Sequence, residues 1–153
     1  MYIDYMMTPV GVLELQASEL GITEISYCES ANNTIISHDI IDRCKQQLTE
    51  YFEGKRREFD LPLDQLGTNF QKSVWASLIK IPFGQVVSYR DIANMINNPK
   101  AVRAVGAANG KNPISIIVPC HRVIGSNGTL TGYAGGLARK AWLLKLEGND
   151  IQK

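Results

Sequence analysis

Hydrophobic and polar residues alternate in three short runs near the start of the chain. These runs are Tyr2–Met6, Val12–Leu15 and Gly21–Ile25, and the turn-forming residues Thr8-Pro9 and Gly11 separate the first two. A period of two between turn residues is typical of strands with one buried face. The pattern therefore predicts a small antiparallel meander of three strands.

The period changes to a helical one after Ser37. Gly54 ends this segment, and Glu58–Leu63 then reads as an extended strand or linker that leads to a domain boundary near Gly67. We therefore expect one helix, with its apolar face formed by Ile40, Ile41, Cys44, Leu48, Tyr51 and Phe52.

Helix start signals recur after the boundary. Thr68 and Gln71 have the spacing of a capping box, and so do Ser88 and Asp91. The first predicts a helix that ends before Pro82, and the second a short helix through Ile96, with Pro99 as the first residue of a third helix. Two short helices around a tight turn form a helix-turn-helix, a pattern that is also common in ordinary helical proteins.

The last part of the chain contains turns and one more helix. Gly125–Gly128 has the composition of a hairpin turn, and Gly132–Gly136 is a loop in which backbone can approach a ligand closely. An amphipathic pattern predicts a final helix from Leu137 to Glu147, with Gly148 as its stop.

An apolar run leads directly to a cysteine with basic neighbours. Ile114–Val118 is rich in β-branched residues, and Pro119 fixes the backbone before Cys120, His121 and Arg122. We expect a buried strand that ends at the cysteine, and two potential cations there favour its thiolate. A buried structural cysteine beside a satisfied histidine is the alternative.

The net charge of +1 hides a strong asymmetry between the two parts of the chain. Residues 1–66 carry five basic and twelve acidic side chains, a net charge of −7, whereas residues 67–153 carry eleven and three, a net charge of +8. A nearly unopposed basic surface is typical of nucleic-acid binding. A solvated basic face balanced by the acidic part is the alternative.

The composition is that of a globular protein without a membrane anchor or a metal site. The 153 residues are 44% hydrophobic and 20% charged. No apolar run reaches the roughly 20 residues that a membrane span needs, and the start of the chain lacks the basic residues of a signal peptide, so we expect a cytoplasmic protein. Three cysteines without a C-x-x-C pair and two histidines predict neither disulfides nor a bound metal.

Several motifs, taken in order, resemble one family. Pro119–Val123 resembles the active-site motif of the DNA-repair alkyltransferases, which move an alkyl group from the O6 atom of guanine onto their own cysteine. The resemblance runs from Thr68 to Gly148, and it is much weaker over residues 1–66. Further motifs that carry it are Ser88–Arg90, Arg103–Gly106, Asn112-Pro113, Tyr133–Leu137 and Trp142–Leu144.

The resemblance implies an α/β fold in two parts. Residues 1–66 would form a small ribonuclease H-like domain, and residues 67–153 a helix-turn-helix, winged-helix-like domain with the active cysteine. The implied function is single-turnover repair of O6-alkylguanine, and also of O4-alkylthymine, without a cofactor or metal. Cys120 would be the nucleophile, His121 would act through a bound water, and Glu147 would orient His121.

The resemblance also assigns residues around the substrate. Asn112 would tie the recognition helix to the active-site segment, and Tyr89 would crowd the rotating phosphate and donate a proton to the leaving guanine. The guanine pocket would be formed by Val123, Tyr133, Ala134 and Gly135. Many relatives have serine at the position of Ala134, which leaves the range of accepted alkyl groups open.

Double-stranded DNA with an alkylated guanine is the implied partner. Arg103 would fill the place of the extruded nucleotide, with Lys100 and Arg122 adding charge. Small residues such as Ala104 would allow close approach to the minor groove without sequence preference, and close helix packing is the alternative. We expect a monomer. Three rivals remain: an alkyltransferase-like protein that lacks the cysteine and only binds lesions, a thiol hydrolase that turns over, and a sequence-specific transcription factor.

Overall fold

The computed structural model describes residues 1–151, and the last two residues of the second expected domain lie outside the described residues. The chain divides into two compact units. The first contains residues 1–66 and also residues 113–115, and the second contains residues 67–112 and the chain from residue 116 onward. Each unit is described by itself.

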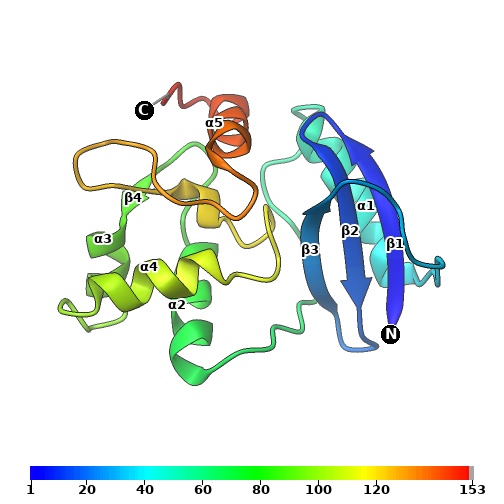
Figure 1. Ribbon diagram of the computed structural model, residues 1–153, viewed down its shortest axis with the longest axis horizontal. Helices are drawn as coiled ribbons and strands as arrows, with labels where there is room; N and C mark the ends of the chain where they lie inside the picture. Colours follow the sequence, from blue (N-terminus) through cyan, green and yellow to red (C-terminus); the bar gives the residue numbers. More distant parts are fainter. Residues whose placement is uncertain (152–153) are drawn as a thin grey trace. The chain divides into compact units, whose positions relative to one another are not determined.

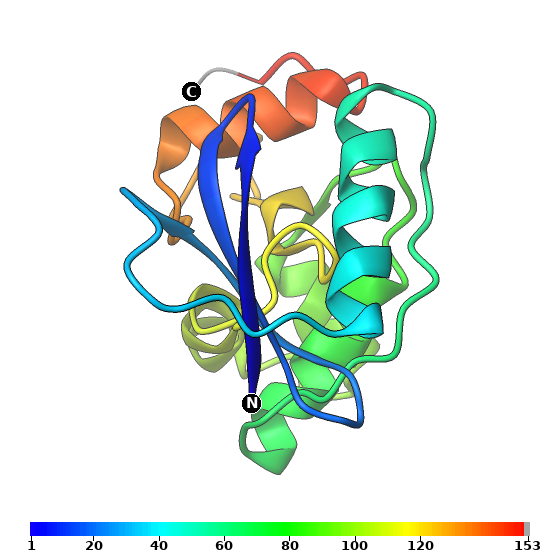
Figure 2. The same cartoon turned by 90° about the vertical axis from the view of Figure 1, so that its right-hand side faces the viewer.

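The first unit is a three-stranded antiparallel sheet with one helix on it. Its strands are β1 (Tyr2–Thr8), β2 (Gly11–Ala17) and β3 (Ile22–Cys28), in the order β1-β2-β3. The helix α1 (Asp39–Phe52) packs against β1 and β2, and Figures 1 and 2 both show it along one face of the sheet. The predicted meander followed by a helix is confirmed.

The alternation in the sequence explains which face of this sheet is buried. Leu13, Leu15 and Ala17 of β2 are fully buried, and the residues between them are only partly covered. Ile41 and Leu48 of α1 are also fully buried. The core of the unit therefore lies between α1 and one face of the sheet.

The second unit contains a helix-turn-helix held by a third helix. Its elements, in chain order, are α2 (Asn69–Ile79), β4 (Val87–Ser88), α3 (Tyr89–Met95), α4 (Val102–Gly110), the 3-10 helix η1 (Cys120–Arg122), β5 (Val123–Ile124) and α5 (Leu137–Leu146). Helices α2, α3 and α4 pack against one another, and α5 packs against η1 (Figure 1). Both predicted capping boxes are present, at Thr68 with Gln71 and at Ser88 with Asp91.

The turn between α3 and α4 is longer than the sequence indicated. Asn97 adopts a left-handed conformation with φ of 57°, which ends α3. Pro99 lies within the turn, and α4 begins at Val102 instead. The helix-turn-helix is confirmed, and only its second start is shifted.

The predicted strand over Ile114–Val118 is wrong. Ile114 makes an isolated parallel bridge to Ile25 of β3, but the chain then turns, and Ile116 has a φ of 74°. The run is buried, as its composition indicated. A buried turn contains apolar side chains just as a buried strand does, so the composition alone did not distinguish the two. Cys120 consequently begins a 3-10 helix and does not end a strand.

The segment around Gly125–Gly128 is a turn but not a hairpin. The amide of Gly128 donates to the carbonyl of Gly125 at 2.9 Å. The short strand β5 before this turn pairs in parallel with β4. The turn was predicted correctly. A hairpin would pair β5 with the segment after the turn, whereas β5 pairs with β4 instead.

Candidate active site

The thiol of Cys120 is almost completely buried in the second unit. Its residue is 5% exposed, and it is the first residue of η1. Burial raises the pKa of this thiol, and the opposing influences are a hydrogen bond from Asn112, the charge of Lys140 and the backbone of Cys120 itself. Burial therefore disfavours the thiolate, whereas the hydrogen bond from Asn112 and the charge of Lys140 favour it.

The other two cysteines have no such neighbours. Burial raises the pKa of Cys44 to about 12, and Cys44 lies on the buried face of α1. Burial and the charge of Glu14 raise the pKa of Cys28, whose thiol donates to the carbonyl of Val12. Only Cys120 combines burial with a nearby cation, a donor amide and an imidazole.

Three buried side chains form a charged cluster next to the cysteine. His121 Nε2 lies 2.8 Å from Glu147 Oε2. Arg122 Nε donates to Glu147 Oε1 at 2.7 Å, and its terminal Nη2 donates to Oε2 at 3.0 Å. The side chains of His121 and Glu147 are fully buried. The carboxylate thus binds the imidazole and the guanidinium at the same time.

The cluster fixes the protonation of His121. Burial raises the pKa of Glu147, but the hydrogen bonds from His121 and Arg122 and the charge of Arg122 outweigh burial and lower that pKa to about 2. Burial also lowers the pKa of His121, so its ring is neutral at neutral pH. Because the ionised carboxylate only accepts hydrogen bonds, Nε2 carries the proton and Nδ1 has a free lone pair. Nδ1 is buried and has no hydrogen-bond partner within residues 1–151, which leaves it available as a base.

The expectation that Arg122 contacts DNA needs correction. Arg122 is only 6% exposed, and besides its two bonds to Glu147 it donates from Nη1 to the carbonyl of Ile81 at 2.7 Å. Its guanidinium also lies 5.8 Å from the ring of Phe83. A side chain with these partners serves the interior, and its charge offsets that of Glu147 rather than that of a phosphate or of Cys120.

Two asparagines connect the end of α4 to the cysteine segment. Asn112 Nδ2 donates to the carbonyl of Val118 at 2.8 Å, and its side chain also hydrogen-bonds the Cys120 thiol. Asn109 Nδ2 lies 3.4 Å from the carbonyl of Cys120. Asn112 was expected here, whereas Asn109 was missed. Its place on the apolar side of a helix, one residue after the buried Ala108, was the available signal.

The residues expected to contact DNA divide by exposure. Lys100, Arg103 and Ala104 are exposed at the turn and on α4, while Val105 and Ala108 of the same helix are buried. Helix α4 thus has a basic, small-residue face toward solvent and an apolar face toward α2 and α3. Close helix packing explains the buried small residue Ala108 but not the exposed Ala104.

The loop after β5 approaches Tyr89. Thr131 Oγ1 donates to the Tyr89 hydroxyl at 2.8 Å. Val123 is buried, Tyr133 and Gly135 are half-buried, and Ala134 is exposed. Three of the expected pocket residues, Tyr133, Ala134 and Gly135, therefore lie on this loop. Thr131, which the sequence analysis did not identify, connects the loop to Tyr89 at the start of α3.

Lys140 is the most unexpected member of this region. It is fully buried on α5, and its Nζ donates to the carbonyls of Val123 at 2.5 Å and Thr131 at 2.6 Å. Burial lowers the pKa of Lys140 to about 8, against the charge of Cys120, which raises it. Helical spacing from Leu143 and Leu144 places Lys140 on the buried face, and that spacing could have revealed it.

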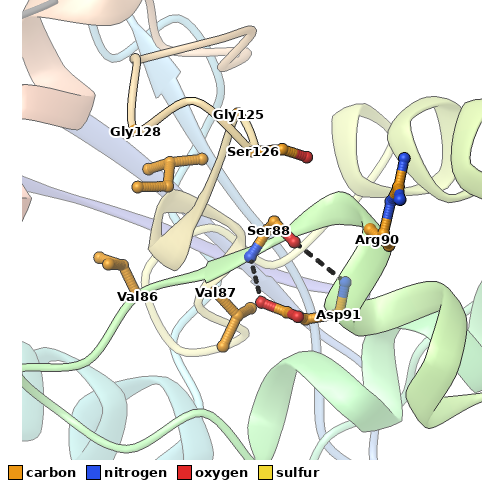
Figure 3. Close-up of a pocket in the computed structure, with 9 residues that line it drawn as sticks. Val86, Val87, Ser88, Arg90, Asp91, Gly125, Ser126 and Gly128 are labelled. Carbon is orange, nitrogen blue, oxygen red and sulfur yellow. Dashed lines mark hydrogen bonds between the residues drawn. The ribbon is translucent and has the colours of Figure 1, made fainter.

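A hollow of about 510 Å³ lies beside the helix-turn-helix. Its walls come from β4, from the start of α3 and from the turn after β5. Figure 3 shows Arg90 and Ser126 at this hollow and marks the two reciprocal hydrogen bonds that join Ser88 to Asp91. Arg90 is exposed at this hollow, next to the exposed carboxylate of Asp91.

The described residues contain neither a candidate metal site nor a helix that could cross a membrane. Over residues 1–151, no group of three or more histidine, cysteine or acidic side chains is placed to hold a metal ion. No helix in the same range has the length and apolar character needed to cross a membrane.

Comparison with known protein families gives two adjoining matches. Residues 1–65 match the domain described as "6-O-methylguanine DNA methyltransferase, ribonuclease-like domain". Residues 69–149 match "6-O-methylguanine DNA methyltransferase, DNA binding domain". A protein of Methanosarcina barkeri named methylated-DNA–protein-cysteine methyltransferase is 47% identical over 158 residues, which cover 99% of this chain and 100% of that protein.

Two solved structures of DNA complexes are similar to this chain, one over nearly its whole length and one over about half of it. The crystal structure of Mycobacterium tuberculosis OGT in complex with DNA has a TM-score of 0.90 and 44% identity, and the match covers 99% of this chain and 95% of that chain. The structure of S. pombe Atl1 in complex with damaged DNA containing O6-carboxymethylguanine has a TM-score of 0.51 and 32% identity, over 57% of this chain and 84% of that one.

Proposed function

The chain belongs to the 6-O-methylguanine DNA methyltransferase family, and on this basis we propose that it moves the alkyl group of O6-alkylguanine in DNA onto Sγ of Cys120, once per molecule. Its enzyme class is methylated-DNA–protein-cysteine methyltransferase, a class of DNA-repair enzymes. We propose Cys120 as the acceptor, and we propose the roles of the other residues and the mode of DNA binding given below.

One observation carries the assignment of Cys120. It is a buried thiol that hydrogen-bonds the side-chain amide of Asn112, and the charge of Lys140 favours its ionised form; the next residue is a histidine whose Nδ1 has no hydrogen-bond partner in residues 1–151. A soft thiolate displaces an oxygen leaving group from carbon efficiently, and burial excludes competing water. The combination favours transfer to sulfur over binding alone.

In the proposed reaction the thiol loses a proton, the alkyl group moves to sulfur, and the guanine receives a proton. His121 Nδ1 takes the thiol proton through a bound water, and Glu147 stabilises the resulting imidazolium. The thiolate forms the new S–C bond while the C–O6 bond breaks. The electron pair of the broken C–O6 bond stays on the guanine oxygen. The Tyr89 hydroxyl gives a proton to the leaving guanine, and the proton held by His121 then returns to the Tyr89 oxygen through water. The products are an unmodified guanine in DNA and a neutral thioether at Cys120.

The burial of Cys120 requires that the nucleotide leaves the base stack. A thiol that is 5% exposed cannot reach a paired guanine inside a duplex, so the alkylated nucleotide rotates out into the protein. Arg103 is exposed on α4 and fills the vacated place in the stack. The small residues of the same face, Ala104 among them, allow contact with the minor groove without reading sequence.

The guanine pocket is proposed at the loop that Thr131 ties to Tyr89. Carbonyls of Cys120 and Val123 accept from the guanine amino group, and the amide of Ala134 faces the O6 atom. An O4-alkylthymine presents the same alkyl-oxygen group to the thiolate and is the second proposed substrate. We propose further that the protein acts as a monomer in the cytoplasm.

The experiment follows transfer from a duplex oligonucleotide that contains one labelled O6-methylguanine, with DNA in excess. We expect one methyl group per protein molecule and no further reaction, and no transfer by Cys120→Ser. Cys28→Ser is the matched control, because it removes the more accessible thiol, and it should react like the wild type. Continued turnover, or transfer by Cys120→Ser, would refute the proposal. Lesion binding without transfer would favour a recognition protein instead.

A further inference from the structure

Asn109 is a buried polar side chain of α4, and its amide oxygen has no partner. The residue is 3% exposed, and its Nδ2 lies 3.4 Å from the carbonyl oxygen of Cys120. Its Oδ1 is buried and has no hydrogen-bond partner within residues 1–151. Buried polar atoms in native proteins are nearly always hydrogen-bonded, because an unpaired one is costly. Oδ1 of Asn109 therefore requires a hydrogen-bond donor that residues 1–151 do not supply.

His121 contains a second buried acceptor of the same kind. Its ring is neutral and its Nε2 carries the proton toward Glu147 Oε2, at 2.8 Å, so that Nδ1 can only accept. This Nδ1 is buried and has no hydrogen-bond partner in the described part of the chain. His121 directly follows Cys120, the residue whose carbonyl lies next to the Asn109 amide. Two unpartnered acceptors therefore lie beside the same cysteine.

The donors nearest to the cysteine are already in use. The two amide hydrogens of Asn112 go to the carbonyl of Val118, at 2.8 Å, and to the Cys120 thiol. The guanidinium of Arg122 is directed at Glu147. One water molecule offers what the two acceptors lack, because it has two hydrogens to donate and an oxygen that can accept a hydrogen bond from a thiol.

We propose that Asn109 is a positioning residue for the proton transfer at Cys120: its Oδ1 and the Nδ1 of His121 each accept one hydrogen of a single buried water, and the oxygen of this water accepts a hydrogen bond from the thiol. The transfer rests on the proposed function, whereas the water site does not. A buried water typically makes about three hydrogen bonds, which is the number assigned to this one. Because a water bridges atoms that lie up to roughly 5 Å apart, Oδ1 and Nδ1 need no direct contact.

The water passes the thiol proton on without being consumed. The S–H bond of Cys120 breaks, its electron pair stays on sulfur, and the proton bonds to the water oxygen. At the same time the water hydrogen directed at His121 leaves the oxygen and bonds to Nδ1. The hydrogen bound to Asn109 stays in place, so the water keeps a lone pair toward the thiol and a hydrogen toward Nδ1. The dipole of the Asn109 carbonyl also favours the partial positive charge that the water carries during the transfer.

A purely structural role is the alternative for Asn109. In that case the side chain would only hold the carbonyl of Cys120, which the proposed pocket offers to the guanine amino group, and Oδ1 would contribute nothing. The two roles differ in what a substitution removes, because the structural role concerns binding of the base and the proposed role concerns proton transfer. Asn109→Leu nearly keeps the size of the side chain and removes both polar atoms, so it separates the two roles.

The first test is a crystal structure of the wild-type protein at a resolution that shows ordered waters. We expect one water within about 3.2 Å of both Asn109 Oδ1 and His121 Nδ1. Asn109→Leu should lack this water, because a site with fewer polar partners does not retain it. An empty gap between the two atoms, or a separate water on each of them, would overturn the proposal. If the water is found and transfer fails, only the proposed function is contradicted.

The second test follows the ring nitrogens of His121 by nitrogen-15 NMR, without DNA. The chain has two histidines, and His38, whose Nδ1 accepts from the amide of Ile40, is the internal reference. An imidazole nitrogen that accepts a hydrogen bond resonates upfield of one that accepts none. We expect Nδ1 of His121 to move downfield in Asn109→Leu and to stay in place in Asn94→Leu, which replaces an exposed asparagine of α3. An unchanged Nδ1 resonance in a folded Asn109→Leu protein would overturn the proposal.

The third test measures the reaction with free O6-benzylguanine at neutral pH, over a range of base concentrations. For Asn109→Leu we expect the maximal rate to fall at least about tenfold, a part of the roughly hundredfold or more that general-base assistance contributes. The concentration that gives half of the maximal rate should not change, and Asn94→Leu should match the wild type in both quantities. An unchanged maximal rate with a higher half-saturating concentration would assign Asn109 to the Cys120 carbonyl alone and overturn the proposal.

Discussion

Glu147→Gln tests the buried cluster that is proposed to prepare His121 for catalysis. The substitution keeps the size of the side chain but removes the charge that binds both His121 and Arg122. Arg122 remains buried at 6% exposure and loses its counter-charge. We therefore expect a large loss of stability as well as a loss of activity.

Two independent routes give a similar magnitude for the loss of stability. The pKa of Glu147 falls from its ordinary value of 4.5 to about 2, which corresponds to about 3 kcal/mol of stability at neutral pH. Breaking a buried ion pair by removing one partner typically costs about 3 to 5 kcal/mol. For a chain of this size the thermal midpoint should fall by about 6 to 20 °C.

The pH dependence provides a sharper signature than the midpoint. Because the folded carboxyl has the lower pKa, its contribution is complete above about pH 4.5 and is lost as the pH falls from about 4.5 to about 2. The wild type should lose about 3 kcal/mol across this window on account of Glu147, and Glu147→Gln should lack that component.

Urea unfolding between pH 2 and 7 measures both effects. Trp75 and Trp142, the two tryptophans of the chain, lie in the second unit, so their fluorescence reports on the unit that holds the cluster. Glu53→Gln, in the first unit, is the control and is followed by far-ultraviolet circular dichroism, since Glu53 pairs with Lys55 at the surface and such pairs contribute at most about 1 kcal/mol. If Glu147→Gln behaves like this control, the cluster does not have the assigned role.

Three further outcomes are expected. Arg103→Ala should slow repair of duplex DNA far more than reaction with a free alkylated guanine base, because the free base needs no unstacking; equal losses would place Arg103 outside the extrusion step. Affinity for duplex DNA should fall steeply with salt and vary little with sequence, as expected for the basic second unit, and a flat salt response would argue against phosphate contacts. Stoichiometric alkylation should lower the thermal midpoint by about 2 to 8 °C, because an added carbon overfills the packed site around Cys120; an unchanged or higher midpoint would rule this out.

Local patterns predicted the elements whose form depends on neighbouring residues. Alternation gave the three strands because β2 has one buried face, with Leu13 and Leu15 toward α1. Capping boxes gave the starts of α2 and α3 because Thr68 and Ser88 bond the backbone only three residues away. Interactions of this range are visible in the sequence itself.

Other features depend on which distant residues meet. The run Ile114–Val118 has a composition suited to a strand, yet a bridge to Ile25 and the left-handed Ile116 turn it toward η1. Adjacency in sequence suggested that Arg122 acts on the thiol or on DNA, whereas Glu147, on a later helix, binds it in the interior. Sequence adjacency assigned the cations at the thiol to His121 and Arg122, whereas the charge that lowers the pKa of Cys120 is that of Lys140, on a helix that packs against η1.

Peptide mass mapping after reaction tests the central claim most directly. The protein is incubated with one equivalent of duplex DNA that contains O6-methylguanine, digested, and analysed for the added methyl group. We expect all of the added mass on the peptide with Cys120 and none on those with Cys28 or Cys44, whose pKa values are raised without a compensating cation. A methyl group on either of these two residues, or on no cysteine at all while the lesion disappears from the DNA, would contradict the account.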